Sequence, residues 1–240
     1  MVLCTLIMAL PVLLGALISR RTGIQLAKVW AGTNLLGLKI FCGLTCKVHG
    51  TENIPERGCI VMSKHQSTFE TYFLSTVLPD FAFVAKRSLT LIPIFGWAIY
   101  LVKFILIDRK SGRSAINQMI EQSRVHLANG THVVVFPEGT RMPVNAAPNY
   151  RAGGAIVAKT LKADILPVVH NAGEFWPRMG MIKWPGEITM HIGEPISCEG
   201  KTPQQALAET QDWIESKMQE ITVPNRFPYN RDSTTERKTA

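Results

Sequence analysis

A histidine and a glutamate five positions apart are the first candidates for chemistry, in the stretch SKHQSTFETY from Ser63 to Tyr72. Five residues advance a continuous helix by about 500°, which would leave His65 and Glu70 about 140° apart. Side chains that meet on one helix are three or four residues apart, so this pair can meet only if a helix begins between them. A histidine that contacts a carboxylate can act as a general base, with the carboxylate as its orienting acid.

The residues between the pair predict such a helix start. The sequence STFE that begins at Ser67 has the S-x-x-E pattern of a capping box, which places Ser67 at the N-cap and Glu70 at N3. His65 then lies on the loop after a strand expected over 59–63. Two simpler interpretations stay open: Glu70 only caps the backbone, or His65 only fills a core contact. Ser67 is interpreted as a cap, with a nucleophilic serine as the alternative.

Strand-like and helix-like segments alternate after residue 45 and predict an α/β fold, with a largely parallel central sheet flanked by helices. The apolar, mostly β-branched runs expected as strands are 59–63, 81–85, 104–108, 132–136, 165–169 and 188–192. The segments expected as helices are 67–78, 111–129, 150–161 and 203–220.

Charged residues follow several of these strands, where open α/β sheets bind ligands. His65, Arg109 and the turn FPEGTR at 136–141 each follow an expected strand. Arg109 and Arg141 carry planar guanidinium groups suited to bidentate contacts with phosphate. Lys86 follows another strand and is either a weaker phosphate candidate or an ordinary surface lysine. The pattern predicts a cleft with one general base and two arginines for an anionic substrate.

Four blocks, in this order, resemble the 1-acylglycerol-3-phosphate acyltransferases, within the wider glycerolipid acyltransferases. His65-x4-Glu70 resembles the first block, with glutamate in place of the family's usual aspartate. Residues 104–109, FPEGTR and 165–169 resemble the other three, and the likeness runs over about 47–195. It implies a catalytic pair of His65 and Glu70. It places Glu138 and Gly139 in the family's acceptor-binding turn. The predicted substrate-binding residues are these two with Thr140, Arg109, Arg141 and, from its position at a strand end, Lys86.

The resemblance implies acyl transfer to the sn-2 hydroxyl of lysophosphatidate, which gives phosphatidate for phospholipid biosynthesis. The donor would be an acyl thioester on coenzyme A or acyl carrier protein, with no cofactor and no metal. His65 would take the hydroxyl proton, a step that contributes about 10²–10⁴ in rate. Two rivals are an acyltransferase for another lysolipid and a non-catalytic membrane protein that binds or carries lipid. A nucleotide-binding module is disfavoured, because the chain has neither a P-loop nor G-x-G-x-x-G.

The first 46 residues are expected to form hydrophobic, membrane-associating helices, ahead of an acyltransferase domain over 47–224 and a disordered polar tail over 225–240. Residues 1–18 are almost uniformly apolar, lack a charged n-region and fit either a span or a half-inserted helix. If they span, the cluster of Arg20, Arg21 and Lys28 places the rest of the chain on the cytoplasmic face of the membrane, the inner membrane in a bacterium.

The composition of the chain also indicates an association with membranes. The formal net charge is +8 while 46% of the residues are hydrophobic, which favours an anionic membrane surface over nucleic acid as the partner. The odd count of five cysteines, without a CxxC pair, indicates reduced, packed thiols. The uncharged stretch LTLIPIFGWAIYLV at 89–102 is interpreted as a buried helix and turn, as the lining of an acyl-chain groove, or as both.

Overall fold

The computed structural model describes residues 2–108, 111–144, 146–223 and 226–227. Over these residues one twisted sheet has the strand order β1-β7-β6-β2-β5-β3-β4. All neighbouring strands are parallel except β6 and β7, which are antiparallel. The strands are β1 Leu44–His49, β2 Ile60–Ser63, β3 Phe81–Lys86, β4 Ile105–Ile107, β5 His132–Val135, β6 Ile165–His170 and β7 Gly186–Ile192. The predicted α/β class is therefore confirmed.

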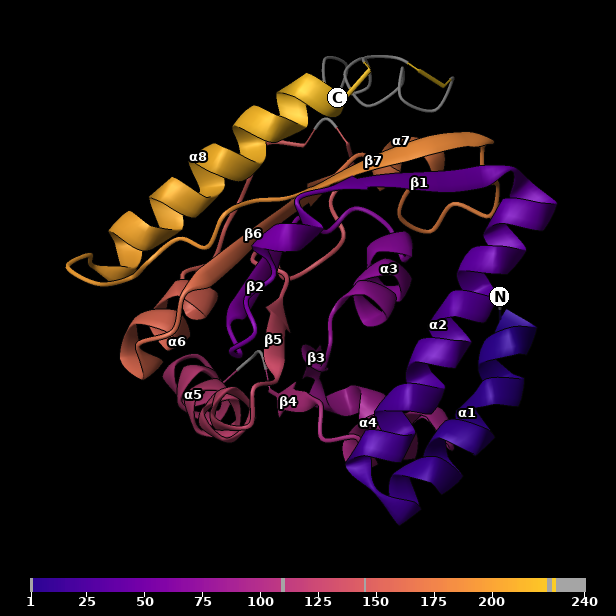
Figure 1. Cartoon of the computed structure of the whole chain (residues 1–240), viewed down its shortest axis with the longest axis horizontal. Helices are drawn as coiled ribbons and strands as arrows, with labels where there is room; N and C mark the ends of the chain where they lie inside the picture. Colours follow the sequence, from indigo (N-terminus) through magenta and orange to yellow (C-terminus); the bar gives the residue numbers. More distant parts are fainter. Residues whose placement is uncertain (1, 109–110, 145, 224–225, 228–240) are drawn as a thin grey trace, which may run out of the picture.

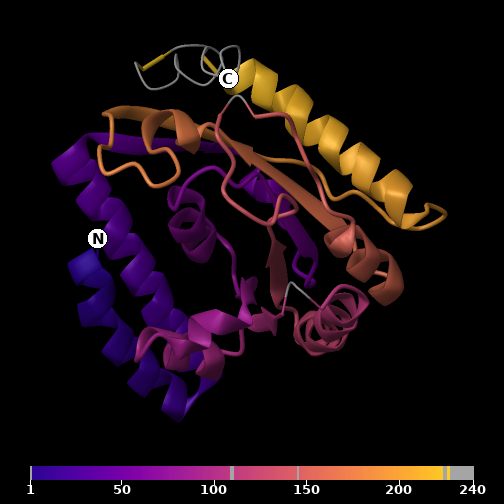
Figure 2. The same cartoon turned by 180° about the vertical axis from the view of Figure 1, so that it is seen from behind.

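Helices cover both faces of the sheet (Figures 1 and 2). They are α1 Val2–Ile18, α2 Arg20–Cys42, α3 Phe69–Val77, α4 Phe95–Leu101, α5 Arg113–Ala128, α6 Gly153–Leu161, α7 Ala172–Phe175 and α8 Pro203–Ile221, with short 3₁₀ turns at Thr51–Asn53 and Arg87–Leu91. On one face, Phe83 and Val134 join a core cluster with α1 to α4. On the other face, their neighbours Val84 and Val135 pack with α5 and α6. The alternation of side chains along each strand thus divides the core between two helical layers.

All six expected strands are present, and one further strand was not expected. β1 begins directly after Gly43, which ends α2 in the left-handed conformation with φ of 61°. β1 pairs in parallel with β7 at the sheet edge and crosses the domain boundary expected after residue 46. The predicted tail at 225–240 lies outside the described residues except for 226 and 227.

Two basic residues of α2 bond the N-terminal hairpin of α1 and α2 to residues at and just before the start of β3. The Arg20 guanidinium donates to the Asp80 carboxylate at 2.7 Å and to the carbonyl of Phe81. The Lys28 ammonium donates to the carbonyl of Leu78 at 2.7 Å. Two residues of the basic cluster that follows residues 1–18, Arg20 and Lys28, therefore form hydrogen bonds within the protein. Among the helices of the described chain, none combines the length and apolarity needed to cross a bilayer.

The uncharged stretch at 89–102 is both a buried element and a cavity wall. Ala98 and Ile99 of α4 are buried, whereas Trp97 and Tyr100 are more than half exposed. The buried side of α4 closes a small, almost wholly apolar cavity of about 100 Å³ against α1, α2 and α3, here called the hairpin cavity. Its wall includes Trp30, Thr71, Ser75, Phe83, Phe95 and Ile99.

Candidate active site

The His65–Glu70 pair forms at the carboxyl end of β2, in the middle of the sheet. β2 ends at Ser63, and α3 begins at Phe69, so a short loop carries His65 to the start of the helix. The imidazole Nδ1 lies 2.7 Å from Oε1 of Glu70, whose side chain is completely buried. The predicted meeting of the two side chains is therefore confirmed, although they are five residues apart.

The helix start differs from the predicted capping box by one residue. The N-cap of α3 is Thr68 rather than Ser67, and Thr68 makes no side-chain cap bond. Instead the Glu70 carboxylate accepts from the backbone N–H groups of Gln66 and Ser67 at 3.1–3.2 Å. The Ser67 hydroxyl accepts from the N–H of Phe69 at 3.3 Å. The glutamate thus satisfies the loop amides, and its orientation toward His65 follows from those bonds.

The imidazole is held in the tautomer that a base requires. Because a carboxylate accepts hydrogen bonds, Nδ1 of His65 carries the proton that it shares with Glu70, and Nε2 keeps a lone pair. Nε2 has no hydrogen-bond partner among the residues that the structure describes, and the side chain is 17% exposed. Phe136 stacks on the ring with centroids 3.9 Å apart. His65 is therefore fixed on one side and open at the nitrogen that can take a proton.

A buried network of ion pairs bonds to the loop that carries His65. Oε2 of Glu138 accepts the backbone N–H of His65 at 2.7 Å. Oε1 of Glu138 lies 3.0 Å from the ammonium of Lys64, which is 3% exposed. That ammonium also contacts Glu215 of α8 at 2.7 Å, and Glu215 accepts from the hydroxyl of Tyr150. Glu138 thus holds the histidine loop, and its expected role in binding substrate stays a prediction.

His170, which has no carboxylate at a telling spacing in the sequence and is interpreted from the sequence as structural, lies beside the pair. It is the last residue of β6, a parallel neighbour of β2, and its Nε2 lies 3.7 Å from Oε2 of Glu70. Its Nδ1 accepts the N–H of Ala172, and its Nε2 donates to the carbonyl of Lys64 at 2.9 Å. The signal that could have found His170 is its place at a strand's carboxyl end.

Burial and neighbouring charges set the ionisation of the acids. Complete burial opposes ionisation of Glu70, but the imidazoles of His170 and His65 outweigh it and hold its pKa below the usual value. For Glu138, burial is the larger effect and raises the pKa despite the ammonium of Lys64. Burial also lowers the pKa of His170, which agrees with its neutral hydrogen-bonding pattern. The environment of the acid that orients the base thus favours its ionised form.

The other predicted substrate-binding residues lie in different environments. The guanidinium of Arg141 donates to the hydroxyl of Thr68 at 2.8 Å, which brings it to the first turn of α3. Thr140 and Lys86 are exposed, and Lys86 ends β3. Arg109 lies outside the described residues. The structure therefore brings Arg141 near the histidine loop and leaves the binding roles of the other three as predictions.

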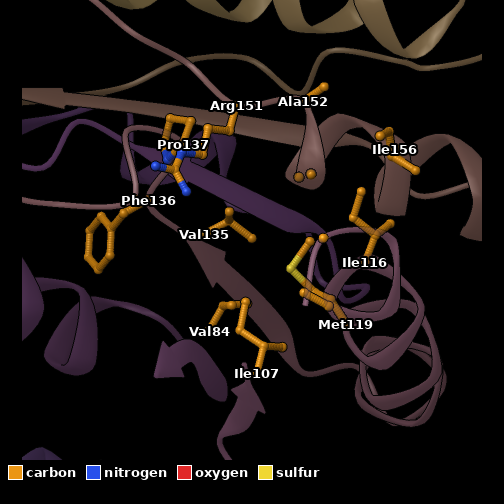
Figure 3. A pocket seen from close by; sticks show the side chains of 15 residues that line it. Val84, Ile107, Ile116, Met119, Val135, Phe136, Pro137, Arg151, Ala152 and Ile156 are labelled. Atoms are coloured by element: carbon orange, nitrogen blue, oxygen red, sulfur yellow. The ribbon is translucent and has the colours of Figure 1, made fainter. Parts of the chain in front are cut away.

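Arg151, which no sequence signal singled out, stands at a larger groove beside the same loop. The groove, here called the α5–α6 groove, has a volume of about 320 Å³. Gly139, whose φ of 70° favours glycine, lies in contact with the Arg151 side chain: a Cβ there would lie 3.5 Å from the guanidinium, an ordinary contact distance. Figure 3 shows Arg151 beside Pro137 at the end near Phe136, with Ile116 and Met119 at the opposite end. The residues that line it are Val84, Ile107, Gly112, Ala115, Ile116, Met119, Val135, Phe136, Pro137, Gly139, Arg151, Ala152, Gly153, Gly154 and Ile156.

The described residues contain no group of three or more His, Cys, Asp or Glu side chains arranged to hold a metal ion. Cys59 and Cys198 are buried and Cys4, Cys42 and Cys46 are half-buried; all five are free thiols. Burial raises the pKa of the Cys59 thiol to about 12, so this thiol is not a nucleophile at neutral pH.

Comparisons with known proteins agree with this arrangement. The family described as Acyltransferase matches residues 45–171. The 1-acyl-sn-glycerol-3-phosphate acyltransferase of Pseudomonas aeruginosa is 41% identical over 187 residues, 76% of this chain and 72% of that protein. The alpha enzyme of that name from Mus musculus is 31% identical over 73% of this chain and 64% of its own length.

A solved structure shares the fold. The 1-acyl-sn-glycerophosphate (LPA) acyltransferase PlsC from Thermotoga maritima superposes with a TM-score of 0.70, over 84% of this chain and 80% of that one, at 24% identity. Its likeness concerns the fold alone, whereas the family match covers the histidine loop, FPEGTR and His170. The chain therefore belongs to the acyltransferase family.

Proposed function

We propose that this chain transfers a fatty acyl group from an acyl thioester to the sn-2 hydroxyl of 1-acylglycerol-3-phosphate, forming phosphatidate. The observation that carries the proposal is the buried, ionised Glu70 bonded to Nδ1 of His65, which leaves Nε2 as an open base. The names of the relatives from Pseudomonas aeruginosa and Mus musculus support the same acceptor.

The chemistry needs one base and no protein nucleophile. Nε2 of His65 takes the hydroxyl proton as that oxygen attacks the thioester carbonyl, and Glu70 stabilises the resulting imidazolium. When the tetrahedral intermediate collapses, the C–S bond breaks and the imidazolium returns the proton to the departing sulfur. The products are an oxygen ester and a free thiol, so protons and electrons balance without a cofactor.

Basic side chains bind the phosphate of 1-acylglycerol-3-phosphate in this proposal. Arg141 is fixed by Thr68 at the start of α3, close in the chain to Glu70. Lys86 at the end of β3 and Arg109 beyond β4 are assigned to the same phosphate on their sequence positions. Thr140 and Gly139 would border the glycerol. The apolar hairpin cavity, whose wall includes Thr71, one residue beyond Glu70, has room for a short segment of an acyl chain.

The proposed substrates are membrane lipids, and the hairpin offers a surface for them. Along α1, the residues Leu3, Ile7, Leu10, Leu14 and Leu17 recur every three or four positions and are 48–69% exposed. Such a stripe is typical of a helix that lies in a membrane interface. Lys39 of α2 is exposed beside Ile40 and Phe41, which suits an anionic lipid surface. We infer that residues 1–46 dock the enzyme on the cytoplasmic face of a membrane.

The test is phosphatidate formation by purified protein in lipid or detergent, with His65→Ala beside the wild type. The wild type should acylate lysophosphatidate, and the folded variant should lose about a hundredfold or more in kcat. Other lysolipids tested in parallel check the acceptor: preference for another lysolipid would refute lysophosphatidate but keep the base. Undiminished transfer by a folded His65→Ala variant would refute the general-base assignment.

A further inference from the structure

The segment that joins α7 to β7, residues 176–185 and here called the α7–β7 loop, exposes large apolar side chains. Met181 is 91% exposed, Met179 is 83% exposed and Ile182 is 67% exposed. Single apolar residues on a protein surface are ordinary. Three of them within four positions of one loop form a patch, and such patches mark surfaces that contact a partner or a membrane.

The loop is well bonded internally, so this exposure does not come from a lack of packing. The N–H of Trp184 donates to the carbonyl of Phe175 at 2.9 Å and closes the loop at its base. The indole N–H of Trp176 donates to the carbonyl of Gly180 at 3.1 Å, and the Trp176 side chain is buried. A loop that is already folded presents its exposed side chains to a partner with little further ordering cost.

Cations stand next to the apolar side chains of the loop. Residues 175–186 include Arg178 and Lys183 and contain no aspartate or glutamate. The ammonium of Lys183 donates to the carbonyl of Met181 at 3.1 Å and lies 4.7 Å from the centre of the Trp176 ring. Apolar side chains beside cations suit the boundary between acyl chains and anionic headgroups in a bilayer.

The loop lies beside the apolar end of the N-terminal hairpin. Its chain rejoins the sheet where the N–H of Gly186 donates to the carbonyl of Gly43 at 3.0 Å, and Gly43 directly follows α2. The last turn of α2 exposes Ile40 by 64% and Phe41 by 86%. Both views show the loop next to this end of α2 (Figures 1 and 2). The exposed apolar residues of the hairpin and of the loop are therefore neighbours.

We propose that the α7–β7 loop is a second membrane-docking element of this protein. Met179, Met181 and Ile182 enter the interface of an anionic bilayer beside α2, with Arg178 and Lys183 at the level of the headgroups. This inference goes beyond the docking proposed for residues 1–46, because it adds a contact from the α/β domain itself. It does not depend on which lysolipid the enzyme acylates.

The loop also contacts the turn that carries a predicted phosphate ligand. The guanidinium of Arg178 donates to the carbonyl of Arg141 at 3.3 Å, and the guanidinium of Arg141 donates to the hydroxyl of Thr68 at the start of α3. A loop seated among headgroups therefore holds this turn at the membrane surface. Two contacts, the hairpin and the loop, fix the orientation of the α/β domain on the bilayer better than the hairpin alone.

Insertion of the loop is tested directly with an added tryptophan in the full-length protein. Met181→Trp is mixed with vesicles of equal parts phosphatidylglycerol and a phosphatidylcholine whose acyl chains carry bromine, which quenches indole fluorescence on contact. The matched control is Val125→Trp on α5, at a site that is 59% exposed next to the ion pair of Arg124 and Glu121. The emission added by Met181→Trp should be quenched and that added by Val125→Trp should not. Equal quenching of the two, or none, would overturn the proposal.

Vesicle binding tests the two parts of the surface separately. Met181→Ser combined with Ile182→Ser removes apolar contact without a change of charge and should weaken binding to the same vesicles about ten- to a hundredfold. Val125→Ser should leave it unchanged. Lys183→Gln should weaken binding to the anionic vesicles about fivefold and leave binding to pure phosphatidylcholine vesicles unchanged. Binding by the paired serine variant that equals wild type would refute the docking role of the loop.

The experiment also separates this proposal from its alternatives. If the wild type were a dimer without lipid and the paired serine variant a monomer, a second copy of the chain would cover the loop and the membrane assignment would be wrong. None of these measurements involves acyl transfer. A wild type that docks through the loop but forms no phosphatidate would therefore refute the proposed function and leave the docking surface intact.

Discussion

We expect a large electrostatic effect on stability from substitution of Lys64, because its ammonium is 3% exposed and contacts two carboxylates. Lys64→Met removes the only cation contacting Glu138 among the described residues and leaves that carboxylate completely buried. Breaking a buried pair on one side costs about 3–5 kcal/mol of unfolding free energy. Glu215 is 25% exposed and can be solvated, so most of the loss should come from Glu138.

The loss should depend on pH in a defined direction. Burial already raises the pKa of Glu138, and removing the ammonium raises it further. A raised folded-state pKa means that the native state binds more protons than the unfolded state, in which a glutamate titrates near about 4.3. The stability of the variant therefore falls as the pH rises from the unfolded value through the folded one. We expect a smaller deficit relative to wild type at pH ~5.5 than at pH ~8.

Urea unfolding at both pH values measures this prediction. Adding Glu138→Gln to Lys64→Met should restore more than half of the lost stability, because the amide carbonyl still accepts the N–H of His65 without a charge. Lys217→Met, which breaks an exposed pair with Glu220, should cost less than about 1 kcal/mol. A deficit below about 1 kcal/mol for Lys64→Met, or one that is equal at both pH values, would refute the reasoning.

Three further predictions concern the base, the hairpin and the turn. Glu70→Gln should lower kcat about 10²–10⁴-fold with little change in the acceptor KM, because the amide no longer selects the His65 tautomer; equal activity in steady-state assays would contradict this. Asp80→Asn should cost about 1–3 kcal/mol in denaturant unfolding by weakening the bond to Arg20. Burial opposes ionisation of Asp80, but Arg20 lowers its pKa, so the wild type should lose this contribution as the pH falls and the variant should not. Gly139→Ala should lower Tm and kcat together, since its φ of 70° is strained for alanine; a stabilised variant would contradict the strain.

Local signals in the sequence explain why the contact between His65 and Glu70 and most strands could be predicted. The turn between His65 and Glu70 is coded within six residues, and the central strands are apolar runs because both of their faces are covered. β1 lacks that signal, since it lies at the edge directly after a helix and, beyond the buried Leu44, its positions are half-buried or exposed.

The rest of the site depends on contacts that sequence spacing does not reveal. Lys64 meets Glu215 across 151 positions, and His170 meets the carbonyl of Lys64 across 106. Arg151 is placed by a single backbone bond to Pro137 on an irregular loop, so no periodic pattern marks it. These side chains become recognisable only when the strand order is known.

The contact between Lys64 and Glu215 also bears on how the enzyme is made. The hairpin, β2, α3 and the FPEGTR turn all precede α6, so a nascent chain has them well before α8 leaves the ribosome. Until residue 215 emerges, the buried ammonium has only one of its two carboxylates, and Tyr150 lacks its acceptor. The histidine loop thus reaches its final electrostatic balance late in translation, when nearly the whole chain can fold as a unit.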